Sequence, residues 1–142
     1  MPEYVQYRTS PTAWMTAELF VDYLKWFDKE MELQNIGRAL LVLDNAPMHI
    51  APSSLRLLCT TIDFLHPNIT RVKQPMDAGI IRSFKAHYRA GLCRELLALE
   101  VLGSSKWNID FGQCIKLTAY AWSKVSNNTI KNCFKHLSFD LA

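Results

Sequence analysis

Two stretches of the chain carry carboxylates in settings where they could hold a metal ion. The first is the apolar run 40–43, followed at once by Asp44, Asn45, Pro47 and His49. This branched run suits a strand buried on both faces, and Pro47 cannot continue a central strand, so the strand should end near Asn45. Asp44 would then lie at a strand's carboxyl end, where open parallel sheets bind ligands and a carboxylate can ligate a hard cation. The alternative is that Asp44 and Asn45 only shape a turn by bonding their own backbone.

The second carboxylate is Asp77, which follows Gln74 and Pro75. Pro75 suits the first position of a helix, so Asp77 would lie in the first turn, where the helix dipole favours a negative charge. That effect explains Asp77 without any metal, and metal ligation is the alternative. The helix should run to about Glu100 with an apolar face at 3.6-residue spacing, formed by Ile81, Phe84, Tyr88, Leu92, Leu96 and Leu99.

Basic residues gather around the same helix. Arg82, Lys85 and Arg89 recur along one side of it, and Arg71 and Lys73 precede it in a loop. We call Arg82, Lys85 and Arg89 the basic stripe. Such a stripe is commonly a solvated face, and the sharper interpretation is that these residues bind phosphate groups.

Composition limits the class of protein. The chain has 142 residues, which suits one domain or part of one, and 49% hydrophobic residues can build its core. With 20% charged residues it is not disordered by composition, and its longest apolar run is too short to span a bilayer. The net charge of +3 permits a nucleic-acid partner. The four cysteines form no close pair, which favours buried free thiols in a reducing compartment.

Several elements must position these residues. A helix should run from Ala17 to about Leu33, with Thr16 as its cap, and residues 4–8 alternate weakly like a short strand. A short helix over 52–59 and a strand over 61–65 should follow the Asp44 strand. Strand, helix and strand in that order predict a right-handed βαβ unit with parallel strands.

The C-terminal third is predicted to be helical. We expect the region 107–142 to extend a single domain that takes in residues 1–142. Its helices are predicted over 111–125 and 129–137, with a cap between them in 126–129. Cys133 and His136 could face the same side of the last helix. Core packing explains these two residues more simply than a metal site does.

Seven motifs together resemble a known family. In order they are AWMT (13–16), LVLDNAPMH (41–49), PNIT (67–70), QPMDAGI (74–80), FKAHYR (84–89), AWSKV (121–125) and TIKNCF (129–134). This set resembles the DDE superfamily endonuclease domain of pogo/Tigger-type transposases, the group that includes centromere protein B and jerky-like relatives. One motif alone would be weak evidence, but the ordered set covers nearly the whole chain.

The resemblance implies an RNase H-like fold and a DNA-acting protein of the nucleus. In that family three acidic residues hold two Mg²⁺ or Mn²⁺ ions for in-line phosphoryl transfer. Asp44 matches the second acid and Asp77 the third, while Asn45, His49 and Gln74 stand beside them as supporting residues. The resemblance thus favours the metal-ligating interpretation of both carboxylates.

The departures from the family pattern matter as well. Nothing before Trp14 resembles the strand that carries the family's first acid, and no part of this sequence resembles the family's N-terminal DNA-binding helices. We therefore expect a truncated α/β fold with two or three parallel strands wrapped by helices, weak metal binding and an isolated chain that does not cut DNA. The Asp44 strand would keep an open edge, where two copies could pair as a homodimer. The alternative function is a non-catalytic, host-adopted nuclear module that binds DNA or protein. We expect DNA, and no membrane, as a partner.

Overall fold

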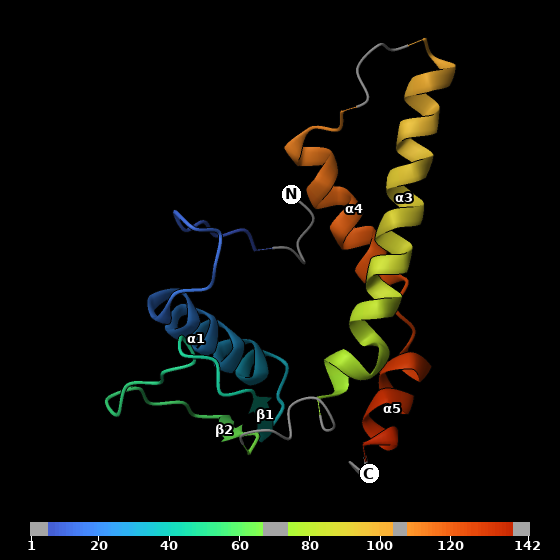
Figure 1. Ribbon diagram of the computed structural model, residues 1–142. Coiled ribbons are helices and arrows are strands. Elements are labelled where there is room, and N and C mark those ends of the chain that lie inside the picture. Colours follow the sequence, from blue (N-terminus) through green and yellow to red (C-terminus); the bar gives the residue numbers. More distant parts are fainter. Residues whose placement is uncertain (1–5, 67–73, 104–107, 138–142) are drawn as a thin grey trace. The chain divides into compact units, whose positions relative to one another are not determined.

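The computed structural model describes residues 6–66, 74–103 and 108–137, and these fall into two compact units. We call residues 7–66 the sheet unit, and residues 74–103 with 108–137 the helical unit. Figure 1 labels their helices and strands. Each unit is described here by itself. No helix in the described ranges combines the length and apolar character needed to cross a lipid bilayer.

The sheet unit opens with the helix α1 (Ala17–Leu33), whose bounds are those predicted. Thr16 caps it, because its side-chain oxygen accepts a hydrogen bond from the Leu19 N–H at 3.2 Å. Phe20, Leu24 and Asp28 recur at four-residue intervals and are the buried residues of the helix. One face of α1 is therefore the core face of this unit, and it includes a carboxylate.

Two strands complete the unit. β1 (Ala39–Leu43) pairs in parallel with β2 (Thr60–Phe64), in a register that sets Ala39 opposite Thr60 and Leu43 opposite Phe64. The parallel pair is thus confirmed. α1 contacts β2, and Figure 1 shows the helix beside the pair.

The prediction that the Asp44 strand is buried on both faces is wrong within this unit. Successive side chains of a strand point to opposite faces. Leu40 is 61% exposed, and Thr61 and Asp63, which share its face, are exposed too. α1 covers only the other face, so β1 is a half-buried strand.

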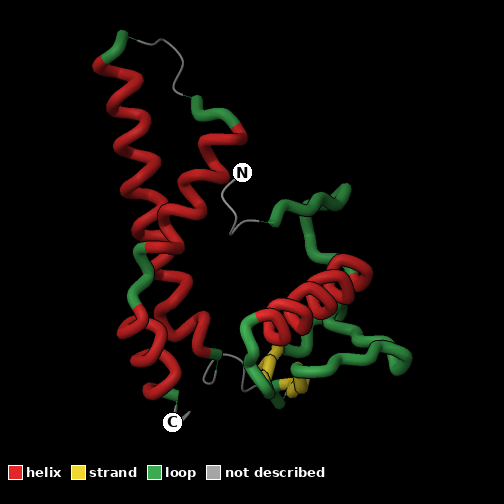
Figure 2. Tube along the Cα trace, turned by 180° about the vertical axis from the view of Figure 1, so that it is seen from behind, coloured by secondary structure: helices red, strands yellow, loops and turns green. Residues whose placement is uncertain are grey.

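The predicted helix over residues 52–59 is absent. Figure 2 shows the connection between β1 and β2 as loop. The reason lies in the Asp28 carboxylate: its Oδ2 accepts the Leu58 N–H at 2.8 Å, and its Oδ1 accepts the N–H groups of Cys59 at 2.9 Å and Thr60 at 2.8 Å. These donors are therefore committed to α1 and do not close helical turns. Residues 6–8 form no strand, and residues 4 and 5 lie outside the described ranges.

The helical unit begins with the short wide turn η1 (Met76–Ile80), which leads directly into α3 (Ile81–Val101). α4 (Phe111–Ser123) has Asp110 and Gln113 as a reciprocal capping box, and α5 (Asn127–His136) is capped by Ser126. The helices lie within about two residues of their predicted bounds. The predicted apolar face of α3 is half-buried throughout, at Ile81, Phe84, Tyr88, Leu92, Leu96 and Leu99.

A small core joins η1 to α5. Ile80, Val125 and Cys133 are buried together, with Phe84, Ile130 and Phe134 packed around them. Cys133 is thus a core residue, as its alternative interpretation predicted. All four cysteines are free, as predicted, but only Cys133 is buried: Cys59 and Cys114 are half-buried and Cys93 is exposed, against the prediction of buried thiols.

Gly91 allows α3 and α4 to approach closely (Figure 1), because a Cβ there would lie only 2.9 Å from Leu117 Cδ2. We expect Gly91→Leu to lower the free energy of unfolding by about 2 kcal/mol through overpacking. Gly91→Ala should be nearly neutral, because about 1 kcal/mol of gained helix propensity offsets a shift of the flexible Leu117 methyl. Thermal unfolding followed by circular dichroism measures both, and a leucine variant as stable as the wild type would contradict this packing.

Candidate functional site

Asp44 is the first residue beyond β1, at the strand's carboxyl end as predicted. Its side chain is 34% exposed. Its Oδ1 accepts the Ala46 N–H at 3.3 Å, so the turn-shaping interaction predicted as the alternative does form. The same oxygen lies 2.8 Å from His49 Nδ1. Oδ2 makes no hydrogen bond to any described residue, which leaves one oxygen of this carboxylate available.

His49 is held from two sides. Its Nδ1 lies 2.8 Å from Asp44 Oδ1 and 3.1 Å from the Asp44 carbonyl oxygen. Both of these atoms are acceptors, so Nδ1 must carry the hydrogen. The imidazole also packs on Phe20 of α1, with ring centroids 4.7 Å apart. Phe20 is 2% exposed, so the imidazole rests on the core of the sheet unit.

Asn45 joins the ends of the two strands. Its side-chain Nδ2 donates a hydrogen bond to the Leu65 carbonyl oxygen. The Leu65 N–H donates to the Leu43 carbonyl at 2.8 Å, which extends the ladder past the end of β2. Asn45 therefore fixes the backbone on which Asp44 stands, which is a physical basis for its predicted supporting role.

Asp77 lies in the helical unit, exposed in the first turn of η1, directly after Pro75 and Met76. The N–H groups of Asp77 and Ala78 both donate to the Gln74 carbonyl oxygen at 3.1 Å. Gln74 thus closes the turn that presents Asp77. The placement of Asp77 at a helix start is confirmed. Because Asp44 and Asp77 belong to different units, their meeting stays a prediction.

The described residues contain no group of three or more His, Cys, Asp or Glu side chains that could hold a metal ion. His136 and Cys133 accordingly form no part of such a group. Asp44 has His49 beside it, with 2.8 Å between His49 Nδ1 and Asp44 Oδ1.

The basic stripe lies along α3. Arg82, Lys85 and Arg89 are all exposed, and their spacing places them on one side of the helix. Gly91 marks the opposite, packed side. Within the described ranges none of the three is ion-paired, so their charges are available to an anion. Arg71 and Lys73 lie outside the described residues.

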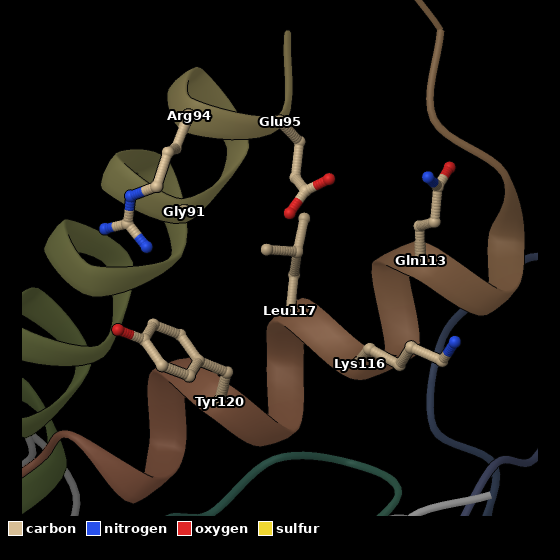
Figure 3. Close-up of a pocket in the computed structure, with 7 residues that line it drawn as sticks. All are labelled: Gly91, Arg94, Glu95, Gln113, Lys116, Leu117 and Tyr120. Atoms are coloured by element: carbon tan, nitrogen blue, oxygen red, sulfur yellow. The ribbon is translucent and has the colours of Figure 1, made fainter. Parts of the chain in front are cut away.

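A pocket between α3 and α4 was not predicted. It has a volume of about 450 Å³ and is lined among others by Arg94, Glu95, Lys116 and Tyr120 (Figure 3). The Arg94 guanidinium carbon lies 6.0 Å from the Tyr120 ring centroid, and Lys124 Nζ lies 5.2 Å from it. The spacing of Lys116, Tyr120 and Lys124 at four-residue intervals was the available sequence signal. The contribution of α3 had no such signal.

These observations define a mixed α/β chain, in which helices accompany a two-stranded parallel sheet with a carboxylate at its carboxyl end. The chain belongs to the DDE superfamily endonucleases: the model of that family matches residues 1–134. The resemblance drawn from the seven motifs is therefore confirmed.

Individual relatives agree with this assignment. Tigger transposable element-derived protein 4 of Mus musculus is 25% identical over 135 residues, covering 95% of this chain and 26% of its own length. CENP-B homolog protein 2 of Schizosaccharomyces pombe is 28% identical over 144 residues, covering 86% of this chain and 27% of its own length. Tigger transposable element-derived protein 7 of Homo sapiens is 28% identical over 167 residues, covering 95% and 29%. The chain thus spans about a quarter of the length of these relatives. The comparison with solved structures gave no match.

Proposed function

We propose that this chain is part of the RNase H-like catalytic domain of a transposase-type DDE endonuclease, in which Asp44 and Asp77 are two of the carboxylate ligands of Mg²⁺ or Mn²⁺. The observation that carries the proposal is the position of Asp44. In a chain of this family, it stands at the carboxyl end of a parallel strand with Oδ2 unbonded among the described residues. Asp77 opens the helical segment of the QPMDAGI motif at residues 74–80.

The donor set fits the metal. Carboxylate oxygens are the ligands that Mg²⁺ and Mn²⁺ prefer, and both side chains are accessible. Two carboxylates brought to one place repel each other unless a cation lies between them. When bound, the metal pair supplies activation of the attacking oxygen and stabilisation of the leaving oxygen in DNA strand cleavage and strand transfer. Asp44 and Asp77 hold the metal, and Asn45 and Gln74 hold the backbone that presents them.

We further propose that the isolated chain binds metal weakly and does not cut DNA. Support comes from the donor count, because the described residues offer no third acidic side chain grouped with Asp44 or Asp77. Fewer carboxylate ligands leave less negative charge to hold the cation, so affinity falls.

Paramagnetic broadening by Mn²⁺ tests the shared site even when binding is weak. We expect sub-stoichiometric Mn²⁺ to broaden the backbone amide signals around Asp44 and around Asp77 at the same concentration, because one ion would lie beside both. Asp44→Asn or Asp77→Asn should remove the broadening at both segments. The measurement is a titration of the ¹⁵N-labelled chain followed by two-dimensional NMR.

Asp63→Asn is the matched control, because Asp63 is an exposed carboxylate on β2 of the same sheet. It should leave the broadening unchanged. Broadening confined to one of the two segments, or unaffected by Asp44→Asn, would reject the shared metal site.

We also propose DNA as the partner and the nucleus as the location. The exposed basic stripe supports phosphate binding, and Arg71 and Lys73 remain part of the proposed surface. Among the relatives, ARS-binding protein 1 of Schizosaccharomyces pombe is 28% identical over 137 residues, and its name says that it binds ARS. A homodimer through the free edge of β1 stays a prediction; among the described residues β1 pairs with β2 alone, so its other edge is unpaired there.

A second candidate function is a non-catalytic module that binds DNA or protein on the same scaffold. The pocket of the helical unit favours it. Arg94 and Lys116 line that pocket beside the Tyr120 ring, and neither is ion-paired to any described residue. Such a surface can hold an anionic partner with no metal chemistry. Absence of metal-dependent broadening together with retained DNA binding would favour this second function.

A further inference from the structure

We propose that His49 is a positioning residue, which fixes the Asp44 carboxylate for metal binding and is itself held by Phe20 of α1. This inference rests on the proposed function, because it assigns a role toward the metal that Asp44 would bind. It adds a residue of α1 to the support of that site, although α1 carries none of the proposed ligands.

The first step is the orientation of the carboxylate. The His49 Nδ1–H faces two acceptors on the same residue, Asp44 Oδ1 at 2.8 Å and the Asp44 carbonyl oxygen at 3.1 Å. A donor shared between the side chain and the main chain of Asp44 restricts rotation of the carboxylate. With Oδ1 also bonded to the Ala46 N–H, Oδ2 is the oxygen left for a cation. The geometry points to coordination through one oxygen.

The second step is the return of the chain to Asp44. The His49 N–H donates to the Ala46 carbonyl oxygen at 2.9 Å, which closes a tight turn containing Pro47. This turn brings the imidazole back over the residue at the strand end. With this turn, a histidine five residues after Asp44 can reach its carboxylate.

The third step is the support of the imidazole. Its ring lies on Phe20 with centroids 4.7 Å apart and planes at 31°. Phe20 is almost fully buried, so it cannot move aside without opening the unit's core. The imidazole, 20% exposed, is thus confined between the core and the carboxylate. Partners of this kind around a metal ligand are worth about 10- to 100-fold in metal affinity.

Two variants of His49 separate donation from packing. His49→Phe keeps an aromatic ring on Phe20 but loses the Nδ1–H donor, and we expect it to weaken Mn²⁺ binding about 10- to 100-fold. His49→Asn keeps an N–H donor near the Nδ1 position and should restore most of the affinity. His136→Phe, at an exposed histidine of α5, is the matched control and should bind Mn²⁺ like the wild type. The Mn²⁺ affinity is measured by electron paramagnetic resonance on the full chain.

A second measurement needs no substitution. Long-range ¹H–¹⁵N spectra of the wild-type chain should show the hydrogen of His49 on Nδ1. A His49 with the hydrogen on Nε2 alone would overturn the proposal, as would a folded phenylalanine variant that binds Mn²⁺ like the wild type. If the Asp44→Asn variant also binds Mn²⁺ like the wild type, the proposed function itself is rejected. If Asp44→Asn weakens Mn²⁺ binding and His49→Phe does not, the proposed role of His49 is rejected while the proposed function stands.

Discussion

Replacing Asp28 with alanine is expected to lower the free energy of unfolding of the sheet unit by about 3 kcal/mol, since hydrogen bonds to a charged group are each worth about 1.5–3 kcal/mol. The Asp28 side chain is buried and accepts the N–H groups of Leu58, Cys59 and Thr60. Alanine leaves these three donors at the start of β2 without their acceptor. Urea unfolding followed by circular dichroism measures the change.

Asp28→Asn and Asp22→Ala frame this prediction. Asparagine has one acceptor oxygen and turns an N–H₂ group toward one of the donors, so we expect an intermediate loss. Asp22 lies exposed on the same helix, and its replacement should change stability by less than about 0.5 kcal/mol. Equal stability of the Asp22 and Asp28 variants would show that the three hydrogen bonds contribute nothing net.

The same carboxylate makes the sheet unit sensitive to acid. Burial acts to raise the pKa of Asp28, but the hydrogen bonds from Leu58, Cys59 and Thr60 outweigh it and hold the pKa below its ordinary value of 3.8. Because the folded-state pKa is lowered, the stabilisation is fully present above pH 3.8 and is lost as the pH falls through the lower folded-state value. The stability difference between wild type and Asp28→Asn should therefore shrink below this pH.

Removing the basic stripe should have the largest effect on DNA binding. Each phosphate contact contributes about −0.9 to the slope of log affinity against log salt concentration. If Arg82, Lys85 and Arg89 each contact a phosphate, the triple alanine variant should flatten that slope by about 2.7. Fluorescence anisotropy with a labelled duplex of random sequence, measured over a range of salt concentrations, gives the slope.

A charge-matched variant controls for net charge. Lys25, Lys29 and Arg38 are exposed in the sheet unit, and their triple alanine variant removes the same three positive charges from a chain of net charge +3. It should weaken binding less and leave most of the slope. Equal effects of the two triple variants would show that the stripe is not the DNA-binding surface.

Local signals in the sequence predicted the helices well. Thr16, Pro75 and Ser126 stand at helix starts, where their side chains or fixed backbone angles act within a few residues. Thr16 as the cap predicted where α1 begins. Parallel pairing of β1 and β2 could likewise be predicted, because the chain between them is long enough for a crossover.

Tertiary contacts account for what the sequence did not predict. Residues 52–59 have helical character, but the Asp28 carboxylate, 30 residues or more away, takes their last N–H groups. A carboxylate in line with Phe20 and Leu24 was the visible signal of a buried acceptor. The apolar run of β1 predicted two covered faces, although the unit supplies one covering helix. The Asp44–His49 contact follows from a turn that spacing alone does not define.

The segment between Asp28 and Leu58 is a closed loop, because the Leu58 N–H donates a hydrogen bond of 2.8 Å to the Asp28 carboxylate. Within this loop lie β1 and the proposed ligand Asp44, as well as His49. Loss of this hydrogen bond would increase the conformational entropy of the segment between Asp28 and Leu58. A substitution in α1 would then loosen Asp44, so the proposed metal binding at the end of β1 depends on an intact α1.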